Sequence, residues 1–112
     1  MRSNKIESYK KTLKLTDVQK EVLVGTLLGD GCLESQNSGR TYRLKVEHSI
    51  QQKDYVDWKY DVFKSWVLTE PKSRRFTSYG ISRTNYRFST VSSGSFRFYA
   101  QQFYKNGKKV IP

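Results

Sequence analysis

Apolar residues recur at helical spacing in three parts of the chain. The first part begins at Thr16 and Gln19, which are spaced as in a capping box, and predicts a helix from about Asp17 to Gly29. The second and third parts lie at 51–67 and 96–103. Their apolar stripes are Val18, Val22, Leu23 and Leu27, then Val56, Tyr60, Phe63 and Val67, and finally Phe96, Tyr99, Ala100 and Phe103.

Alternating apolar and polar positions predict two hairpins between these helices. From Cys32 the pattern is extended, pauses over the polar stretch 35–40 and resumes over 41–48. In this last segment Tyr42, Leu44 and Val46 are expected on one face and Arg43, Lys45 and Glu47 on the other. A second hairpin is expected from 73–80 and 85–93, with a short turn between them.

The order of the predicted elements is αββαββα, which is an α+β fold. The 112 residues are enough for one small domain, which we expect over 15–112. Residues 1–14 are polar and Lys-rich and are expected to form a loose, basic N-terminal arm.

Charge points to a polyanionic ligand. Lys and Arg number 21 against 10 Asp and Glu, for a net charge of +11. One cysteine, Cys32, and one histidine, His48, cannot form a disulfide framework or a Cys/His zinc site within one chain. No apolar run approaches the ~20 residues of a membrane-spanning helix, and the polar start lacks a signal-peptide core. We therefore expect a soluble, intracellular protein without a membrane partner; organellar and bacterial compartments are not distinguished.

The segment LVGTLLGDGCL, residues 23–33, departs from an ordinary core helix. Gly25 and Gly29 share one helix face, where missing side chains would let a second helix approach closely. Asp30 follows at the helix C-terminus, where a carboxylate is disfavoured, and Gly31 is expected to close the helix in the left-handed conformation. Two such helices would bring two copies of Asp30 together around a cation such as Mg²⁺. Taken alone, the segment fits a metal site and a purely structural role equally well. In the structural role, Gly25 and Gly29 only allow helices to pack and Asp30 is an ordinary turn residue.

The segment also resembles the signature nonapeptide of the LAGLIDADG homing endonuclease family. Residues 23–31 match it at the first Leu, at the Gly in position three and at the closing Asp-Gly. The segments TYRLKVEH, KDYVDW to SWVL followed by Pro71, and NGKKVIP extend the likeness over 15–112. Together they resemble the first half of the monomeric, intron-encoded members.

The resemblance implies an αββαββα half-fold whose antiparallel strands form a saddle along the DNA major groove. It implies catalytic roles for Asp30, Lys109 and Glu47, with Glu47 preferred over His48, and metal ligands at Asp30 and Gly31. The cofactor would be Mg²⁺ or Mn²⁺, with Ca²⁺ bound without cleavage. Candidate DNA contacts are Arg40, Arg43, Lys45, Arg75, Arg83 and Arg87, of which Arg75 cannot share one strand face with its neighbour Arg74.

The single signature motif leaves several alternatives open. We expect a homodimer or a separate second half, and an inactive truncated half is a further option. The implied function is metal-dependent, site-specific cleavage of double-stranded DNA. The alternatives are an intron-RNA splicing cofactor and a non-cleaving DNA-binding relative. A nuclease that uses Glu70-Pro71-Lys72 as an E-x-K site with Asp30 is disfavoured, because Pro71 would have to sit inside a central strand, where it cannot donate to the ladder.

Overall fold

The computed structural model describes residues 4–110. Its main elements are α1 (Asn4–Thr12), α2 (Asp17–Leu28), β1 (Cys32–Gln36), β2 (Thr41–Ser49), α3 (Lys53–Phe63), β3 (Lys72–Ser78), β4 (Ile81–Ser89), α4 (Arg97–Phe103), β5 (Tyr104–Lys105) and β6 (Lys108–Lys109). Single 3₁₀ turns occur at η1 (Asn37–Gly39), η2 (Ile50–Gln52), η3 (Lys64–Trp66) and η4 (Gly94–Phe96).

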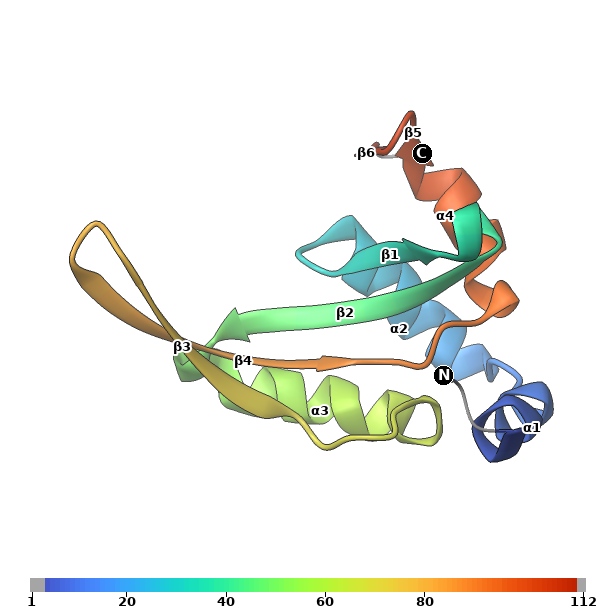
Figure 1. Cartoon of the computed structure of the whole chain (residues 1–112), viewed down its shortest axis with the longest axis horizontal. Coiled ribbons are helices and arrows are strands. Elements are labelled where there is room, and N and C mark those ends of the chain that lie inside the picture. Colours follow the sequence, from blue (N-terminus) through green and yellow to red (C-terminus); the bar gives the residue numbers. More distant parts are fainter. Residues whose placement is uncertain (1–3, 111–112) are drawn as a thin grey trace.

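Four antiparallel strands form the main sheet in the order β1-β2-β4-β3. Helices α2 and α3 pack against one face, and Figure 1 shows the β3–β4 hairpin running out past α3. We call the other face the open face, because no described element covers it. The register puts alternate residues there, including Arg43, Lys45 and Glu47 of β2 and Arg87 of β4.

The core lies between the sheet and the helices. It contains Leu23, Leu27, Leu33, Leu44, Val46, Val56, Phe63, Trp66, Phe88, Phe96, Ala100 and Phe103. The predicted capping box of Thr16 and Gln19 is confirmed, and the same Gln19 also joins α2 to its neighbour. Its amide donates to the carbonyl of Val62 at 2.9 Å and accepts from the indole of Trp66 at 3.2 Å. Gln19, which belongs to the capping box at the start of α2, therefore also fixes α3 against α2.

The predicted order αββαββα is confirmed from α2 to α4, but both ends differ from the prediction. Residues 4–12 form a helix, so the prediction of a loose arm is wrong for them; the Tyr9 hydroxyl donates to the carbonyl of Ser65 at 2.5 Å. The boundary between 1–14 and 15–112 stays a prediction. At the other end, Asn106 and Gly107 form a tight turn between β5 and β6, with φ of 53° and 77°.

The turn of the second hairpin lies at Tyr79 and Gly80, not between 80 and 85 as the sequence suggested. Both residues have positive φ, 53° and 75°, which is the pairing that a two-residue turn between twisted strands requires. Because tyrosine rarely adopts this conformation, the local pattern contains only a weak turn signal. The hairpin is consequently longer than expected, with seven paired positions between β3 and β4.

Candidate active site and nucleic-acid interface

Asp30 lies in the turn that follows α2. Its side chain is 81% exposed, and Nδ1 of His48 lies 3.8 Å from its Oδ2. The backbone after α2 folds back, since Gly29 and Gly31 both donate to the carbonyl of Thr26. This turn holds an accessible carboxylate at the end of the helix.

Gly31 serves a different purpose from the one the sequence suggested. The prediction of a left-handed helix end is wrong, because Gly31 is not among the glycines with positive φ. A Cβ at this position would lie 2.2 Å from Cγ2 of Thr26 and 3.0 Å from its carbonyl oxygen. Gly31 is needed because the turn presses directly against buried Thr26.

Lys109 reaches this turn from the other end of the chain. Its Nζ donates to the carbonyl of Gly29 at 2.8 Å and to that of Gly31 at 2.6 Å. The β5–β6 hairpin carries it there, and the Tyr104 hydroxyl accepts from the amide of Leu33 at 2.9 Å. An ammonium group therefore stands beside Asp30. The Gly31 carbonyl, expected to help hold a metal, is paired with that ammonium group.

His48 is the residue of β2 that faces Asp30. Its side chain is only 11% exposed, and its ring meets Tyr55 edge-on at 5.3 Å. Nε2 is buried and has no hydrogen-bond partner among residues 4–110. From the sequence we preferred Glu47 for this place. The alternation of β2 already indicated that residue 48 shares the face of Leu44 and Val46, but it could not show that this face ends beside Asp30.

Glu47 points to the open face instead. It accepts a hydrogen bond from Asn85 at 2.9 Å and lies 3.5 Å from the ammonium of Lys45. Burial alone would raise the pKa of Glu47, but the Asn85 hydrogen bond and the charges of Lys45 and Arg87 outweigh it, so its pKa lies below the ordinary value. Glu47 is therefore a carboxylate at neutral pH, set among cations.

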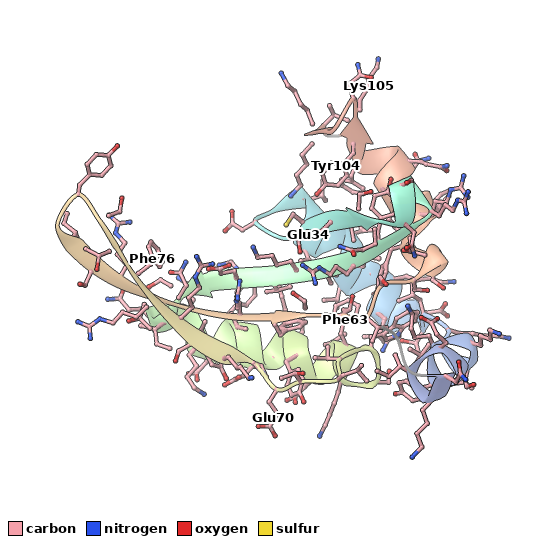
Figure 2. All side chains as sticks on the ribbon, in the orientation of Figure 1. Glu34, Phe63, Glu70, Phe76, Tyr104 and Lys105 are labelled. Carbon is pink, nitrogen blue, oxygen red and sulfur yellow. The ribbon has the colours of Figure 1, made fainter. Side chains whose placement is uncertain are left out.

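The open face carries a groove of about 640 Å³ bounded by β1, β2, β4 and β3. Figure 2 shows Glu34 on this side of the sheet, where it pairs with Arg43 at 2.9 Å. The cations that line the groove are Arg43, Lys45, Lys72, Arg74 and Arg87. These five cations outnumber the nearby carboxylates, so the groove carries a net positive charge.

The other predicted DNA contacts lie outside this groove. Arg83 is exposed on the open face farther out on β4, and Arg40 is exposed just before β2. Arg74 is the member of its pair on the open face, whereas Arg75 points to the side of the helices.

The alternative site at Glu70 and Lys72 is disfavoured in the structure as well. Lys72 begins the edge strand β3 and Pro71 precedes it, so the Glu70-Pro71-Lys72 segment does not lie in a central strand of the described sheet. Glu70 and Lys72 line the groove, and Asp30 does not. The structure therefore does not bring these three residues together.

Gly25 and Gly29 are exposed on α2. A Cβ on Gly25 would meet nothing within 4 Å among the described residues. Val18 and Leu28 are exposed on the same helix, and Tyr55 and Trp58 stack on α3 with centroids 6.5 Å apart. The Tyr55 ring also meets that of His48, whose Nδ1 lies 3.8 Å from Asp30. Exposed apolar side chains on two helices are typical of a surface that binds another protein.

Asp30 offers one exposed carboxylate, which is the kind of ligand that an oxygen-bound divalent ion prefers. Residues 4–110 contain no group of three His, Cys, Asp or Glu side chains placed to hold a metal. A divalent ion at Asp30 would therefore need further ligands from outside these residues.

A family model, described as the LAGLIDADG DNA endonuclease family, matches residues 20–112. The chain belongs to this family. DNA endonuclease I-ChuI from Chlamydomonas applanata is 31% identical over 97 residues, which cover 82% of this chain and 44% of that protein. Protein RecA from Mycobacterium gastri is 43% identical over 47 residues, which cover 40% of this chain and 11% of that protein.

A solved homing endonuclease structure matches almost the whole chain. The homing endonuclease I-WcaI bound to its DNA recognition sequence superimposes with a TM-score of 0.91 at 26% identity, over 99% of this chain and 49% of that one. The predicted α+β half-fold is thereby confirmed. The chain spans less than half of the length of I-ChuI and about half of that of I-WcaI. Among residues 4–110, every helix is too short or too polar to span a membrane.

Proposed function

We propose that this LAGLIDADG chain forms half of a metal-dependent, site-specific DNA endonuclease. The observation that carries the proposal is the meeting of Asp30, His48 and Lys109 at the end of α2, next to a basic groove. The three side chains come from the turn after α2, from β2 and from β6, so the fold gathers them from distant parts of the sequence. A carboxylate, an imidazole and an ammonium are the groups that phosphodiester hydrolysis uses.

Each residue has a distinct role in this proposal. Asp30 provides one carboxylate for an Mg²⁺ or Mn²⁺ ion; when bound, the ion stabilises the charge that develops on phosphate oxygens. Lys109 places a positive charge beside the same turn and can stabilise the phosphate or polarise a water molecule. His48 offers a ring nitrogen, Nδ1, near Asp30 to position that water.

The second half would pack on the exposed surface of α2 and α3. Gly25 and Gly29 allow close approach of a helix, and Val18, Leu28 and Trp58 supply apolar area. A two-fold axis through the α2 surface would bring a second Asp30 to the site and complete the carboxylate pair. We propose a homodimer on a roughly palindromic target, with a separate partner half as the other arrangement.

DNA would lie along the open face, where the groove cations contact phosphates and base edges. Antiparallel strands of this size fit the major groove. The five cations that line the groove support this placement, as do Arg40 and Arg83 beside it. Arg75, which faces the helices, is the weakest of the predicted contacts.

The test compares Asp30→Asn with Asp61→Asn, an exposed aspartate on α3 that serves as the matched control. Sequences cleaved from a randomised duplex library with Mg²⁺ define the target, and the mass in solution gives the stoichiometry. We expect Asp30→Asn to abolish cleavage while binding in Ca²⁺ stays within a few-fold, and Asp61→Asn to retain both. Cleavage by Asp30→Asn would refute the metal role, and binding without cleavage by the unaltered chain would indicate a non-cleaving relative.

A further inference from the structure

The β3–β4 hairpin extends beyond the rest of the sheet. Strand β2 pairs with β4 only through residues 85–89, so 81–84 pair with β3 alone. We call residues 75–84 the arm, which is distinct from the N-terminal arm predicted for residues 1–14. Figure 1 shows the arm projecting past the end of α3, and Figure 2 shows Phe76 far out on it, away from the core residue Phe63. Packing against the core therefore does not explain which residues the arm carries.

The two faces of the arm differ in chemistry. The register places Phe76 opposite Arg83, and Ser78 opposite Ile81, all on the open face. The other face carries Arg75, Thr77, Ser82 and Thr84. Ile81 is 56% exposed, and the guanidinium of Arg74 lies 6.0 Å from the centroid of the Phe76 ring. The open face thus changes from strongly cationic in the groove to mixed on the arm, where the apolar side chains of Phe76 and Ile81 lie beside Arg83 and Ser78.

The major groove of DNA offers an apolar group that side chains such as Phe76 and Ile81 could contact. A two-stranded β-ribbon fits the major groove, and the apolar group that the groove presents is the C5 methyl of thymine. The Phe76–Arg83 and Ser78–Ile81 pairs are two residues apart along each strand, roughly 7 Å. That spacing corresponds to about two base-pair steps. Two apolar side chains continuous with a basic groove are therefore suited to two neighbouring thymine positions.

Resting on the proposed function, we infer that the arm sets specificity at the outer end of each half-site by apolar contact. Phe76 and Ile81 pack against thymine methyl groups, and Arg83 beside them donates to a guanine edge or a phosphate. The inner base pairs, over the groove, are recognised by hydrogen bonds from charged side chains.

The experiment uses a randomised duplex library bound by the purified chain in Ca²⁺. We expect the enriched duplexes to contain thymine, on either strand, at two adjacent outer positions. Replacing those thymines with deoxyuridine removes only the methyl groups and should weaken binding about fourfold per methyl, the value of one buried methyl group. Deoxyuridine at inner positions should change affinity less.

Three variants make the assignment specific. Phe76→Ala and Ile81→Thr should abolish the sensitivity to deoxyuridine, and Ile81→Thr keeps a β-branched side chain so that the strand is retained. Phe98→Ala, at an equally apolar position on α4 that is 61% exposed, should leave the sensitivity unchanged. Equal affinity for thymine and deoxyuridine duplexes, or equal sensitivity in Phe76→Ala, would overturn the inference. Failure to enrich any sequence would instead overturn the proposed function.

Discussion

The turn after α2 shows how individual residues are held in place by distant ones. Lys109 approaches Gly29 and Gly31 from the C-terminal hairpin, and buried Thr26 presses on Gly31 from the preceding helix. Asp30 itself remains exposed. Its position is therefore determined by its neighbours, and substitutions of these neighbours should change it in predictable ways.

Gly31→Ala should destabilise the chain by about 1–3 kcal/mol, as overpacking in a buried region does. The added Cβ would collide with Cγ2 of Thr26. The double variant Thr26→Ser, Gly31→Ala removes that methyl group and should recover part of the stability. Urea unfolding measures the free energy of each variant. Additive effects of the two substitutions would show that this collision does not determine the choice of glycine.

His48 and Glu47 are neighbours in β2 whose substitutions should have different effects. His48→Ala should lower the cleavage rate by about 10²-fold or more, as expected on removal of a group that moves or positions a proton. Glu47→Gln should strengthen DNA binding slightly, because it removes a carboxylate from a cationic surface. Single-turnover cleavage and binding in Ca²⁺ separate the two effects. A larger drop in cleavage rate for Glu47→Gln would support the role first predicted for it.

Among the elements, those with a strong local pattern were predictable. The capping box defined the start of α2, and the alternation of β2 defined its two faces. The Asn106-Gly107 turn has the strongest short hairpin signal in the chain, yet we did not predict it from the sequence. Tyr79 in a positive-φ turn provides no such signal. The pairing of β2 with β4 joins residues some forty apart, which local pattern does not reveal.

Gly25 provides the test of the α2 surface. Because a Cβ there meets nothing within residues 4–110, Gly25→Ala should raise the stability of the isolated chain by up to about 1 kcal/mol. Gly25→Leu should prevent close helix approach and reduce association, measured by sedimentation. Lys20→Leu, exposed on the same helix but on a different face from Gly25, controls for a general effect of adding leucine. Unchanged association of Gly25→Leu would place the partner on another surface.

At the scale of the whole molecule, charge and shape act together. The net charge of +11 predicted a polyanionic ligand, but composition could not show that five cations gather in one groove. Likewise, the family signature pointed to Asp30 and Lys109 as a site, whereas the position of His48 depends on where a strand ends in space. Local sequence therefore predicted the parts, and long-range packing determined which of them meet.

The salt dependence of DNA binding should show whether the groove cations contact phosphates. Lys45→Ala and Arg87→Ala should each reduce the slope of log affinity against log salt by about 0.9 for every phosphate that the variant no longer binds. Lys64→Ala, an exposed lysine in η3 that does not line the groove, serves as the control. Fluorescence anisotropy at four or more salt concentrations measures the slope. Equal slopes for all three variants would place the DNA elsewhere.

Strand β2 sends successive residues to opposite faces, with Glu47 toward the groove and His48 toward Asp30. A slip of β2 by one residue would exchange these two sets at once. On the proposed function, substitutions at positions 41, 43, 45 and 47 would change the contacts to DNA, whereas 44, 46 and 48 keep the core and the neighbourhood of Asp30 in place. The odd and even positions of this one strand would thus separate target choice from the catalytic site.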